Sequence, residues 1–563
     1  MEQNVGLNAS QEKETSSQAP DGSHHQVGVD DVSDSDPPKK ASLSRIWWSI
    51  LCFSMLVAEM QASLETTMTA DLQATVIHTF GEVLKFPWIN VTYSLALGAS
   101  CLLWGKLLVF FNNKRILLLS RVLFAVGSAL TAASPTMNAF IVGKAITGFG
   151  SSGTYISVIV IITALTSAQD QGRYFGYIGF MWGLGTVVGP PIGGAFAVTA
   201  GGWRWAFYFN LILVAVTFPV FVFVLPPDEP PGSHKSLWTR VRRIDSLGCL
   251  LFVGALVSGV FGLSFAGSQY PWSSGRIIGL FCCSGVLWIA FSIQQITALL
   301  TSKEDRILPI HILRSWEMWN LIVQTGCSIS MLFITIYYVP LYLQFVRGQS
   351  AIRSAVDLLP FLFTSVFAML VSGRLITNVG WYKCWFVAGS SLALIMSVCL
   401  YTLELDTPQG KLYGYLILGG VGTGLYAMNS GPAMSAIVAK EHIKDAGTVF
   451  GCIDTISGAI AVGIANCVFV NQATDKIQRI LPDTPRVVVQ EAITGVGASL
   501  TDQLEPAVRN TILQAILDAI QDGWIQLMAT AALSLVLSFG LRNKKLSDVS
   551  KNRPLCNAET VPF

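Results

Sequence analysis

Long apolar segments recur along this 563-residue chain, and they constrain its fold more than any other feature. Crossing the hydrocarbon core of a bilayer takes about 20 mostly apolar residues in helical form. Every backbone group in such a segment must be hydrogen-bonded inside it, so runs of this length indicate helices. The chain therefore predicts an all-α membrane protein with 14 transmembrane helices, near residues 47–69, 87–108, 116–134, 138–165, 174–199, 205–225, 245–267, 276–299, 319–345, 356–378, 384–404, 412–438, 446–470 and 523–541.

Polar stretches divide these runs into groups of six, two and six. The first stretch is rich in Ser, Asp, Gln and Pro and lacks an apolar core, which is typical of a disordered tail rather than a signal peptide. The expected organisation is a disordered cytoplasmic tail at 1–46, a six-helix bundle at 47–225, a cytoplasmic linker at 226–244, two central helices at 245–299, a cytoplasmic loop at 300–318, a second six-helix bundle at 319–541 and a cytoplasmic tail at 542–563.

The second bundle includes a long outer loop at 471–522. Apolar residues recur there at helical spacing between Val508 and Ile520. This spacing predicts an amphipathic helix that covers the outer mouth or lies on the membrane interface. A packing cap with no role in transport is the alternative.

The basic residues indicate the orientation of the chain. Cytoplasmic loops retain Lys and Arg, and placing both chain ends inside puts about twenty basic residues there against roughly ten outside. We therefore expect both termini in the cytoplasm. The plasma membrane is the expected location, and a vacuolar membrane stays open.

Composition narrows the possible partners. Hydrophobic residues make up 52% of the chain and charged residues only 12%, so the bilayer itself is an expected partner. A net charge of +2 gives no basic excess for nucleic acid, and nothing indicates an obligate protein partner. The six histidines are scattered and no CxxC or HExxH spacing occurs, so neither a metal site nor a cofactor is predicted.

Ionisable residues inside the spans are the first functional candidates. A charged side chain near the membrane centre costs about 2.5–3.5 kcal/mol, so it is retained mainly where it faces a cavity, a partner or a proton path. Four residues meet this condition, and we interpret them as candidates for proton coupling: Glu59, Glu65, Lys144 and Asp454. A fixed buried ion pair that only orients helices is the alternative.

The fifth span carries a string of small residues with a proline inside it. Glycines three and four residues apart allow two helices to approach closely in lipid, and the proline opens the helical hydrogen-bond ladder. The string resembles the antiporter motif of the major facilitator superfamily, and its main members are Gly185, Gly189, Pro190, Gly193 and Gly194.

Other segments resemble the same superfamily in the expected order. The segment Gly105–Arg115, with Lys106 and Lys114, is similar to its loop signature between spans two and three. Leu64–Thr67, which contains Glu65, resembles the first-span signature of the fourteen-span drug:proton antiporter branch. That branch includes fungal pumps that export toxins, drugs or secondary metabolites. The resemblance implies two six-helix bundles around one central site.

The chain also departs from the superfamily pattern. An Asp that helps to lock the two bundles on the cytoplasmic side is usual where this chain has Val109, and Gly-Arg is usual at Asn112 and Asn113. Lys144 stands where Arg is usual, and Glu65 stands where Asp is usual. We hypothesise that Glu65 accepts the coupling proton and that Lys144, from a neighbouring helix of the same bundle, biases its protonation.

A mostly apolar organic substrate needs aromatic faces and a few polar groups around it. Seven residues in the spans could supply them, although each is individually more typical of packing: Trp88, Tyr93, Gln324, Tyr337, Tyr338, Phe361 and Asn429.

These features favour a secondary transporter over an enzyme. The sequence has no GxxxxGK[ST] loop, so an ion gradient has to supply the energy. We expect export of a small molecule by proton antiport with alternating access. Proton-coupled uptake of a nutrient or an iron chelate by the same fold is the first alternative, and a non-transporting membrane sensor is the second.

Overall fold

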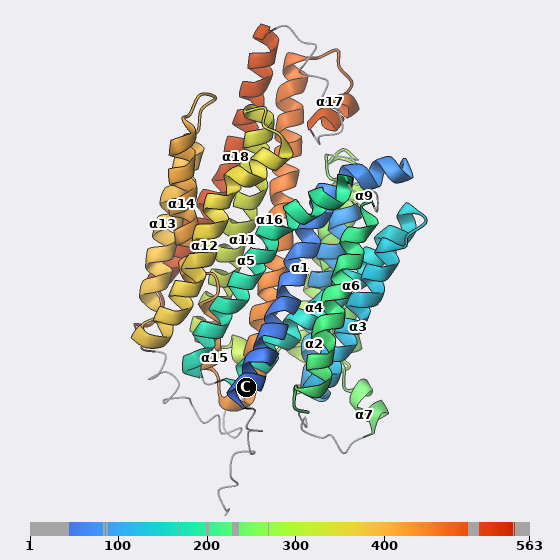
Figure 1. Cartoon of the computed structure of the whole chain (residues 1–563), viewed down its shortest axis with the longest axis vertical. Coiled ribbons are helices and arrows are strands. Elements are labelled where there is room, and N and C mark those ends of the chain that lie inside the picture. Colours follow the sequence, from blue (N-terminus) through green and yellow to red (C-terminus); the bar gives the residue numbers. More distant parts are fainter. Residues whose placement is uncertain are drawn as a thin grey trace, which may run out of the picture. The chain divides into compact units, whose positions relative to one another are not determined.

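A computed structural model describes residues 44–82, 85, 88–166, 168–198, 202–227, 236–267, 270–493, 506–543 and 545, which are almost entirely helical (Figure 1). The predicted disordered tail at 1–46 lies outside this part of the chain except for its last three residues, as does most of the tail at 542–563. The main helices are α1 Arg45–Phe80, α2 Trp88–Phe110, α3 Asn113–Ala132, α4 Met137–Leu165, α5 Ala168–Val198, α6 Arg204–Phe223, α7 Leu237–Arg242, α8 Ser246–Phe265, α9 Gly275–Thr297, α10 Ile310–Leu313, α11 Trp316–Leu341, α12 Ala351–Val379, α13 Lys383–Tyr401, α14 Gln409–Tyr426, α15 Ser430–Ile437, α16 Ile443–Ile480, α17 Arg486–Ile493 and α18 Pro506–Phe539.

The prediction of an all-α membrane protein is confirmed. Among the described residues, twelve helices are long and apolar enough to cross a membrane. The other two expected spans, 174–199 and 412–438, are also helical, as α5 and as α14 with α15, but glycine and polar residues lower their hydropathy. The count of fourteen spans therefore stays a prediction.

The outer-loop segment expected to form an amphipathic helix is helical, but it belongs to the same helix as the last span. The apolar residues after Val508 form the first turns of α18, which continues without a break into the last span. Helix α16 likewise runs ten residues beyond the expected end at 470. The two extensions pack together, with a 2.7 Å ion pair between Lys476 and Asp522. In Figure 1, α16 and α18 reach the upper end of the view.

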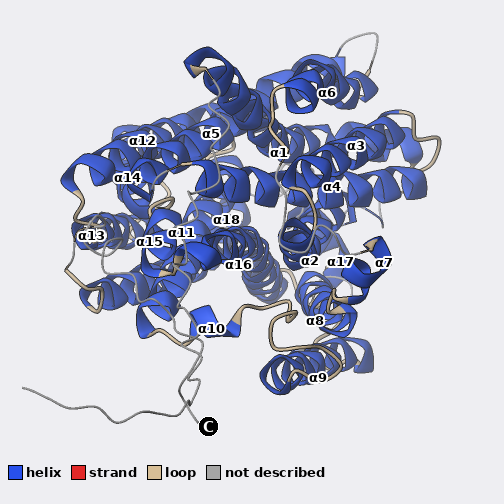
Figure 2. Cartoon of the chain, turned by 90° about the horizontal axis from the view of Figure 1, so that it is seen from below, coloured by secondary structure: helices blue, strands red, loops and turns tan. Residues whose placement is uncertain are grey.

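We call α1–α6 the N-terminal half and α11–α18 the C-terminal half. Within the N-terminal half, α3 packs on α4 and α1 packs on α5; within the C-terminal half, α12 and α13 pack on α14. The halves meet where α5 packs on α12 and where α16 packs on α2 and α4, as the view in Figure 2 also shows. Helices α8 and α9 pair with each other, and α8 contacts α2 and α16.

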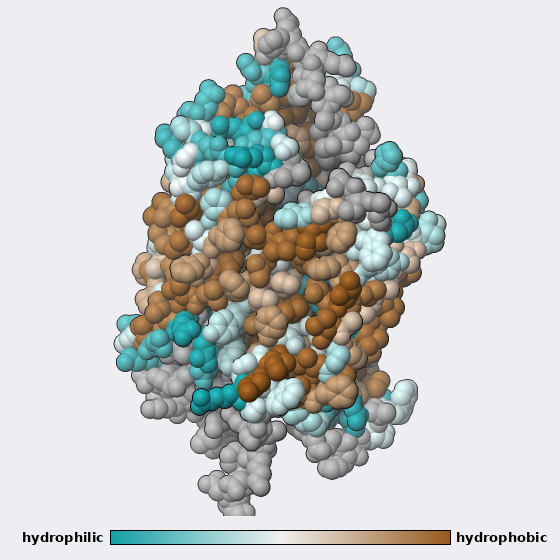
Figure 3. Space-filling view, in the orientation of Figure 1, coloured by the Kyte–Doolittle hydropathy of each residue, from teal (hydrophilic) through white to brown (hydrophobic). Residues whose placement is uncertain are grey.

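The surface agrees with a multi-pass membrane protein. In Figure 3, hydrophobic residues cover the middle of the visible face and hydrophilic residues gather toward its two ends. Large apolar side chains that point outward on the spans include Phe223, which is 84% exposed, and Phe367, which is 68% exposed. Lipid rather than water is the environment in which such exposure is favourable.

Two close contacts between the halves lie at the ends of the helices predicted to be cytoplasmic. Phe175 of α5 packs edge-on against Phe450 of α16, with ring centroids 5.2 Å apart. A side chain at Gly105 of α2 would collide with Thr448 of α16. The structure is therefore closed at this end.

Candidate functional site

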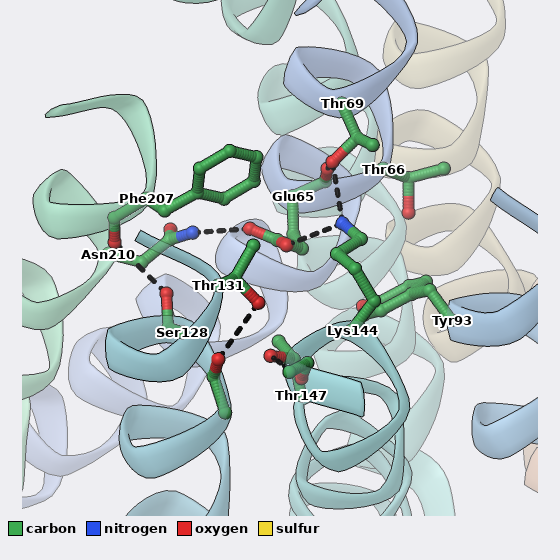
Figure 4. Close-up of polar contacts among 12 residues, drawn as sticks. Glu65, Thr66, Thr69, Tyr93, Ser128, Thr131, Lys144, Thr147, Phe207 and Asn210 are labelled. Atoms are coloured by element: carbon green, nitrogen blue, oxygen red, sulfur yellow. Dashed lines mark hydrogen bonds and ion pairs between the residues drawn. The ribbon is translucent and has the colours of Figure 1, made fainter. Parts of the chain in front are cut away.

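The structure brings Glu65 of α1 and Lys144 of α4 together inside the N-terminal half. Lys144 Nζ lies 2.6 Å from Glu65 Oε1 and also donates a 2.6 Å hydrogen bond to Thr69 Oγ1 (Figure 4). Asn210 of α6 donates to the other carboxylate oxygen of Glu65 at 2.5 Å. Both charged side chains are at most 1% exposed.

Aromatic rings complete this cluster. The ammonium group of Lys144 lies 5.1 Å from the ring centre of Tyr93 and 5.4 Å from that of Phe207, and such contacts stabilise a cation. Both carboxylate oxygens of Glu65 are therefore occupied, and its charge is compensated. This arrangement ties α1, α2, α4 and α6 together, and removing one charge leaves the other buried and unpaired.

A second polar cluster lies between the two halves. The hydroxyl of Tyr155 on α4 donates a 2.6 Å hydrogen bond to Asp454 Oδ2 on α16. Glu59 of α1 is 1% exposed and lies within electrostatic range of Arg121 on α3 and, more weakly, of Asp454. Among the described residues, neither Oδ1 of Asp454 nor Oε1 of Glu59 has a hydrogen-bond partner. A buried, unpaired carboxylate oxygen is costly when charged, so each of these two carboxyls is a candidate site for binding a proton.

Arg121 of α3 is a buried cation that the sequence analysis missed. It is 1% exposed, donates to Gln61 Oε1, and has its guanidinium carbon 5.2 Å from the ring centre of Phe124. The carboxyl of Glu59 on α1 lies within electrostatic range of its charge, and among the described residues its Nε has no hydrogen-bond partner. A lone arginine inside the expected span at 116–134 is a signal that could have identified it.

The glycine string of α5 faces α1. A side chain at Gly185 would meet Met60 and Ser63, and one at Gly189 would overlap Thr67. Gly194 is different, because nothing lies within 4 Å of the position its Cβ would take. Pro190 lies inside the continuous helix α5, and Gly193 is buried.

The segment Gly105–Arg115, which resembles the superfamily's loop signature, spans the end of α2 and the start of α3. Asn112 caps α3, because its side-chain oxygen accepts hydrogen bonds from the backbone N–H groups of Lys114 and Arg115. Lys106, at the end of α2, is 7% exposed and donates to the carbonyl oxygen of Glu304 at 3.4 Å.

The predicted substrate residues do not form one group. Tyr93 donates a hydrogen bond to Ser151 beside the Glu65–Lys144 pair. Gln324 bonds to Ser534 and so joins α11 to α18. Trp88 packs on the aromatic rings of α8, and Phe361 is fully buried. Tyr338 donates a hydrogen bond to the carbonyl oxygen of Ala465. Asn429, between α14 and α15, donates one to the carbonyl oxygen of Leu425.

Trp88 and Tyr337 are only partly buried, whereas the other five candidates are buried. Unlike Trp88, which packs on α8, Tyr337 lies on a helix of the C-terminal half. Its hydroxyl donates a 2.9 Å hydrogen bond to Asn466 of α16. An aromatic pair that the sequence analysis did not single out joins the halves: the rings of Trp182 on α5 and Phe333 on α11 lie 5.5 Å apart. Phe333 also packs against Gly458, one helical turn after Asp454.

Comparison with known protein families shows to which family the chain belongs. A match to the Major Facilitator Superfamily extends over residues 47–464. The chain belongs to the major facilitator superfamily. It is therefore a multi-pass membrane transporter and not an enzyme.

Superfamily members from fungi resemble the chain over nearly its whole length. The MFS-type transporter pgmG of Aspergillus terreus is 38% identical over 91% of this chain and 92% of its own length. The efflux pump alnA of Emericella nidulans is 33% identical over 91% and 93%. The solved structure of the proton:xylose symporter XylE has a TM-score of 0.55 with 11% identity, over 90% of this chain and 99% of that one, and this likeness shows the fold alone.

Val109 stands where the superfamily usually has an aspartate, and a carboxylate from the other half of the protein lies close to it. Val109, at the position of that aspartate, lines a small space between α2 and α16 together with Asp445 of α16. A carboxylate from the C-terminal half thus lies beside the place where the superfamily usually has one in the N-terminal half.

Proposed function

We propose that this protein exports a small organic molecule, of the toxin, drug or secondary-metabolite class, in exchange for protons. Relatives that are 33% identical to it are named efflux pumps. The glycine string of α5 resembles the antiporter motif, which also favours export. We propose the plasma membrane as its location, with a vacuolar membrane as the alternative.

The observation that carries the proposal is the cluster of Glu59, Tyr155 and Asp454. Its two carboxylates are buried, each has an unpaired oxygen, and the hydrogen bond of Tyr155 crosses from one half to the other. Glu65, by contrast, has both oxygens engaged within a single half. We therefore assign the coupling proton to Asp454 with Glu59, and we assign a positioning role to Glu65 and Lys144.

This placement explains how a proton could drive alternation. Opening the predicted cytoplasmic end requires α4 and α16 to move apart, so the bond between Tyr155 and Asp454 must break. The charge on Asp454 changes the strength of that bond, because hydrogen bonds to charged groups are worth about 1.5–3 kcal/mol and neutral ones about half as much. A proton that binds one arrangement better shifts the equilibrium toward it.

The substrate site is proposed beside the same cluster. Trp182 and Phe333 offer aromatic faces, and Phe333 packs at Gly458, one helical turn along α16 from Asp454. Tyr337 with Asn466 offers polar groups on α11 and α16. Aromatic surface with a few convergent polar atoms suits a planar, mostly apolar organic molecule. Substrate bound there would lie close enough to Asp454 to compete with its proton.

The direction of proton movement tests this function. Purified protein in liposomes that contain a pH-sensitive dye is exposed to a panel of aromatic compounds added outside. An antiporter exchanges entering compound for leaving protons, so the internal pH rises, whereas a proton-coupled uptake system makes it fall. A rise supports export by antiport, a fall supports uptake, and no compound-dependent change with any compound argues against proton coupling.

A further inference from the structure

Two histidines that are far apart in the chain meet an aspartate at the predicted cytoplasmic end. His311 comes from α10, His442 immediately precedes α16, and Asp445 lies in the first turn of α16. His442 Nδ1 lies 3.4 Å from Asp445 Oδ2, and His311 Nε2 lies 3.9 Å from the same oxygen. One potential ligand atom from each residue lies within 4.8 Å of the other two. We call these residues the His–His–Asp cluster.

The chemistry of the cluster suits a transition metal. Ligands around a tetrahedral Zn²⁺ with bonds of about 2.1 Å lie roughly 3.4 Å from one another, which is the separation of His442 and Asp445. His311 must approach slightly; its side chain is 49% exposed, and its ring centre lies 4.1 Å from that of His442. Two imidazoles with one carboxylate favour Zn²⁺ and similar ions over Mg²⁺ and Ca²⁺, which prefer oxygen ligands alone.

We propose that the His–His–Asp cluster binds Zn²⁺ or a chemically similar divalent transition metal, with water at the remaining position. His442 and Asp445 are three residues apart and so point from one face at the start of α16. Their side chains are 33% and 22% exposed, which allows an ion to enter and leave from the aqueous side. The site is thus suited to reversible binding.

The metal would act on the contact between the two halves. Ile307 and Pro309, just before His311, line the small space between α2 and α16 with Gly105 and Thr448. Gly105 and Thr448 themselves are in close contact. An ion that fastens α10 to α16 therefore holds this segment against the closed end of the molecule and slows the separation of α2 from α16.

The charge of Lys106 limits the affinity. Its ammonium group lies within electrostatic range of both His311 and Asp445, and it repels a bound cation. The competing interpretation is that Asp445 interacts only with His442 and Lys106 and that no metal binds. Direct binding measurements separate these two interpretations.

The binding experiment uses the purified full-length protein and Zn²⁺ in competition with a chromophoric chelator. His311→Ala and His442→Ala remove cluster ligands, and His78→Ala at the end of α1 is the matched control. We expect His311→Ala and His442→Ala each to weaken Zn²⁺ binding at least about 10-fold, the scale reached even by loss of an outer-shell partner, and His78→Ala to leave it unchanged. Equal affinity in all four proteins would overturn the proposal.

Cobalt binding gives a second readout that does not depend on transport. Bound Co²⁺ should show visible absorption without a thiolate charge-transfer band, because no cysteine belongs to the cluster, and the absorption should vanish in His311→Gln and His442→Gln. These variants keep a side chain of similar polarity, so they replace the alanine variants if those fail to fold. A thiolate band would assign the metal to exposed cysteines such as Cys282 and Cys384 instead and overturn the proposal.

The effect on the closed end rests on the proposed transport function and is measured separately. Zn²⁺ on the cytoplasmic side should slow compound-driven proton movement several-fold in the unmodified protein and in His78→Ala, but not in His311→Ala. Binding without inhibition would refute the mechanical effect and leave the metal site standing. Proton movement absent in every protein would count against the proposed function, while the binding result decides the metal site alone.

Discussion

The hydroxyl of Tyr155 on α4 lies 2.6 Å from Asp454 Oδ2 on α16, so one hydrogen bond links a residue of the N-terminal half to a carboxylate of the C-terminal half. Asp454 keeps a second, unpaired oxygen, and Glu59 lies in electrostatic range. In the proposed mechanism, in which the halves separate on one side, this bond is the element that links protonation to conformation.

Tyr155→Phe should shift the molecule away from the arrangement closed at the cytoplasmic end. The change removes the hydroxyl but keeps the ring, and losing a hydrogen bond to a charged group costs about 1.5–3 kcal/mol, or roughly a 10- to 100-fold change in population. Distances between spin labels on the cytoplasmic ends of α5 and α12 would report it. Tyr337→Phe is the control, because its hydroxyl bonds to Asn466 within one half; an equal shift in both variants would contradict the account.

Glu65→Gln should lower the free energy of unfolding, while the protein that stays folded keeps compound-driven proton movement. Without the carboxylate, Lys144 keeps a buried charge without its ion-pair partner, which costs about 3–5 kcal/mol. Replacing both residues, as Glu65→Gln with Lys144→Met, should recover most of that loss. Thermal unfolding in detergent measures both effects. If the stable double variant has lost all compound-driven proton movement, Glu65 itself carries the proton and the positioning role is wrong.

Gly189→Ala should be more harmful than Gly194→Ala, although both replace glycine by alanine in the same helix. The new methyl group overlaps Thr67 at the first position and meets open space at the second. Overpacking of this kind costs about 1–3 kcal/mol, so the Gly189 variant should unfold at lower temperature and transport more slowly. Equal behaviour of the two variants would mean that the approach of α5 to α1 does not constrain the protein.

The fold could be predicted from the sequence because the bilayer leaves few choices. A long apolar run must become a helix, and an ionisable residue inside one must find a partner. These two rules predict the helices and make Glu65 and Lys144 plausible neighbours, and the structure does bring them together. The coupling role of Glu65 is a separate matter that proximity does not test.

The remaining features of the structure could not be predicted, because they depend on contacts between residues that are far apart in the sequence. A tyrosine in an apolar run is ordinary, so nothing marked Tyr155 as the partner of Asp454, and Arg121 was overlooked among the buried charges. The outer amphipathic segment has the same periodicity whether it forms a separate helix or extends α18. His311 and His442 meet only through the fold, so sequence spacing could not reveal the His–His–Asp cluster.

The most direct test of the central claim measures proton movement and substrate exchange side by side in liposomes containing Asp454→Asn. Exchange of labelled compound for unlabelled compound needs alternation without net proton transfer, whereas compound-driven pH change needs the proton site. We predict that the variant keeps compound exchange within a few-fold of the unmodified protein and loses the pH change. A variant that still moves protons with the compound would contradict the assignment of the coupling proton to Asp454.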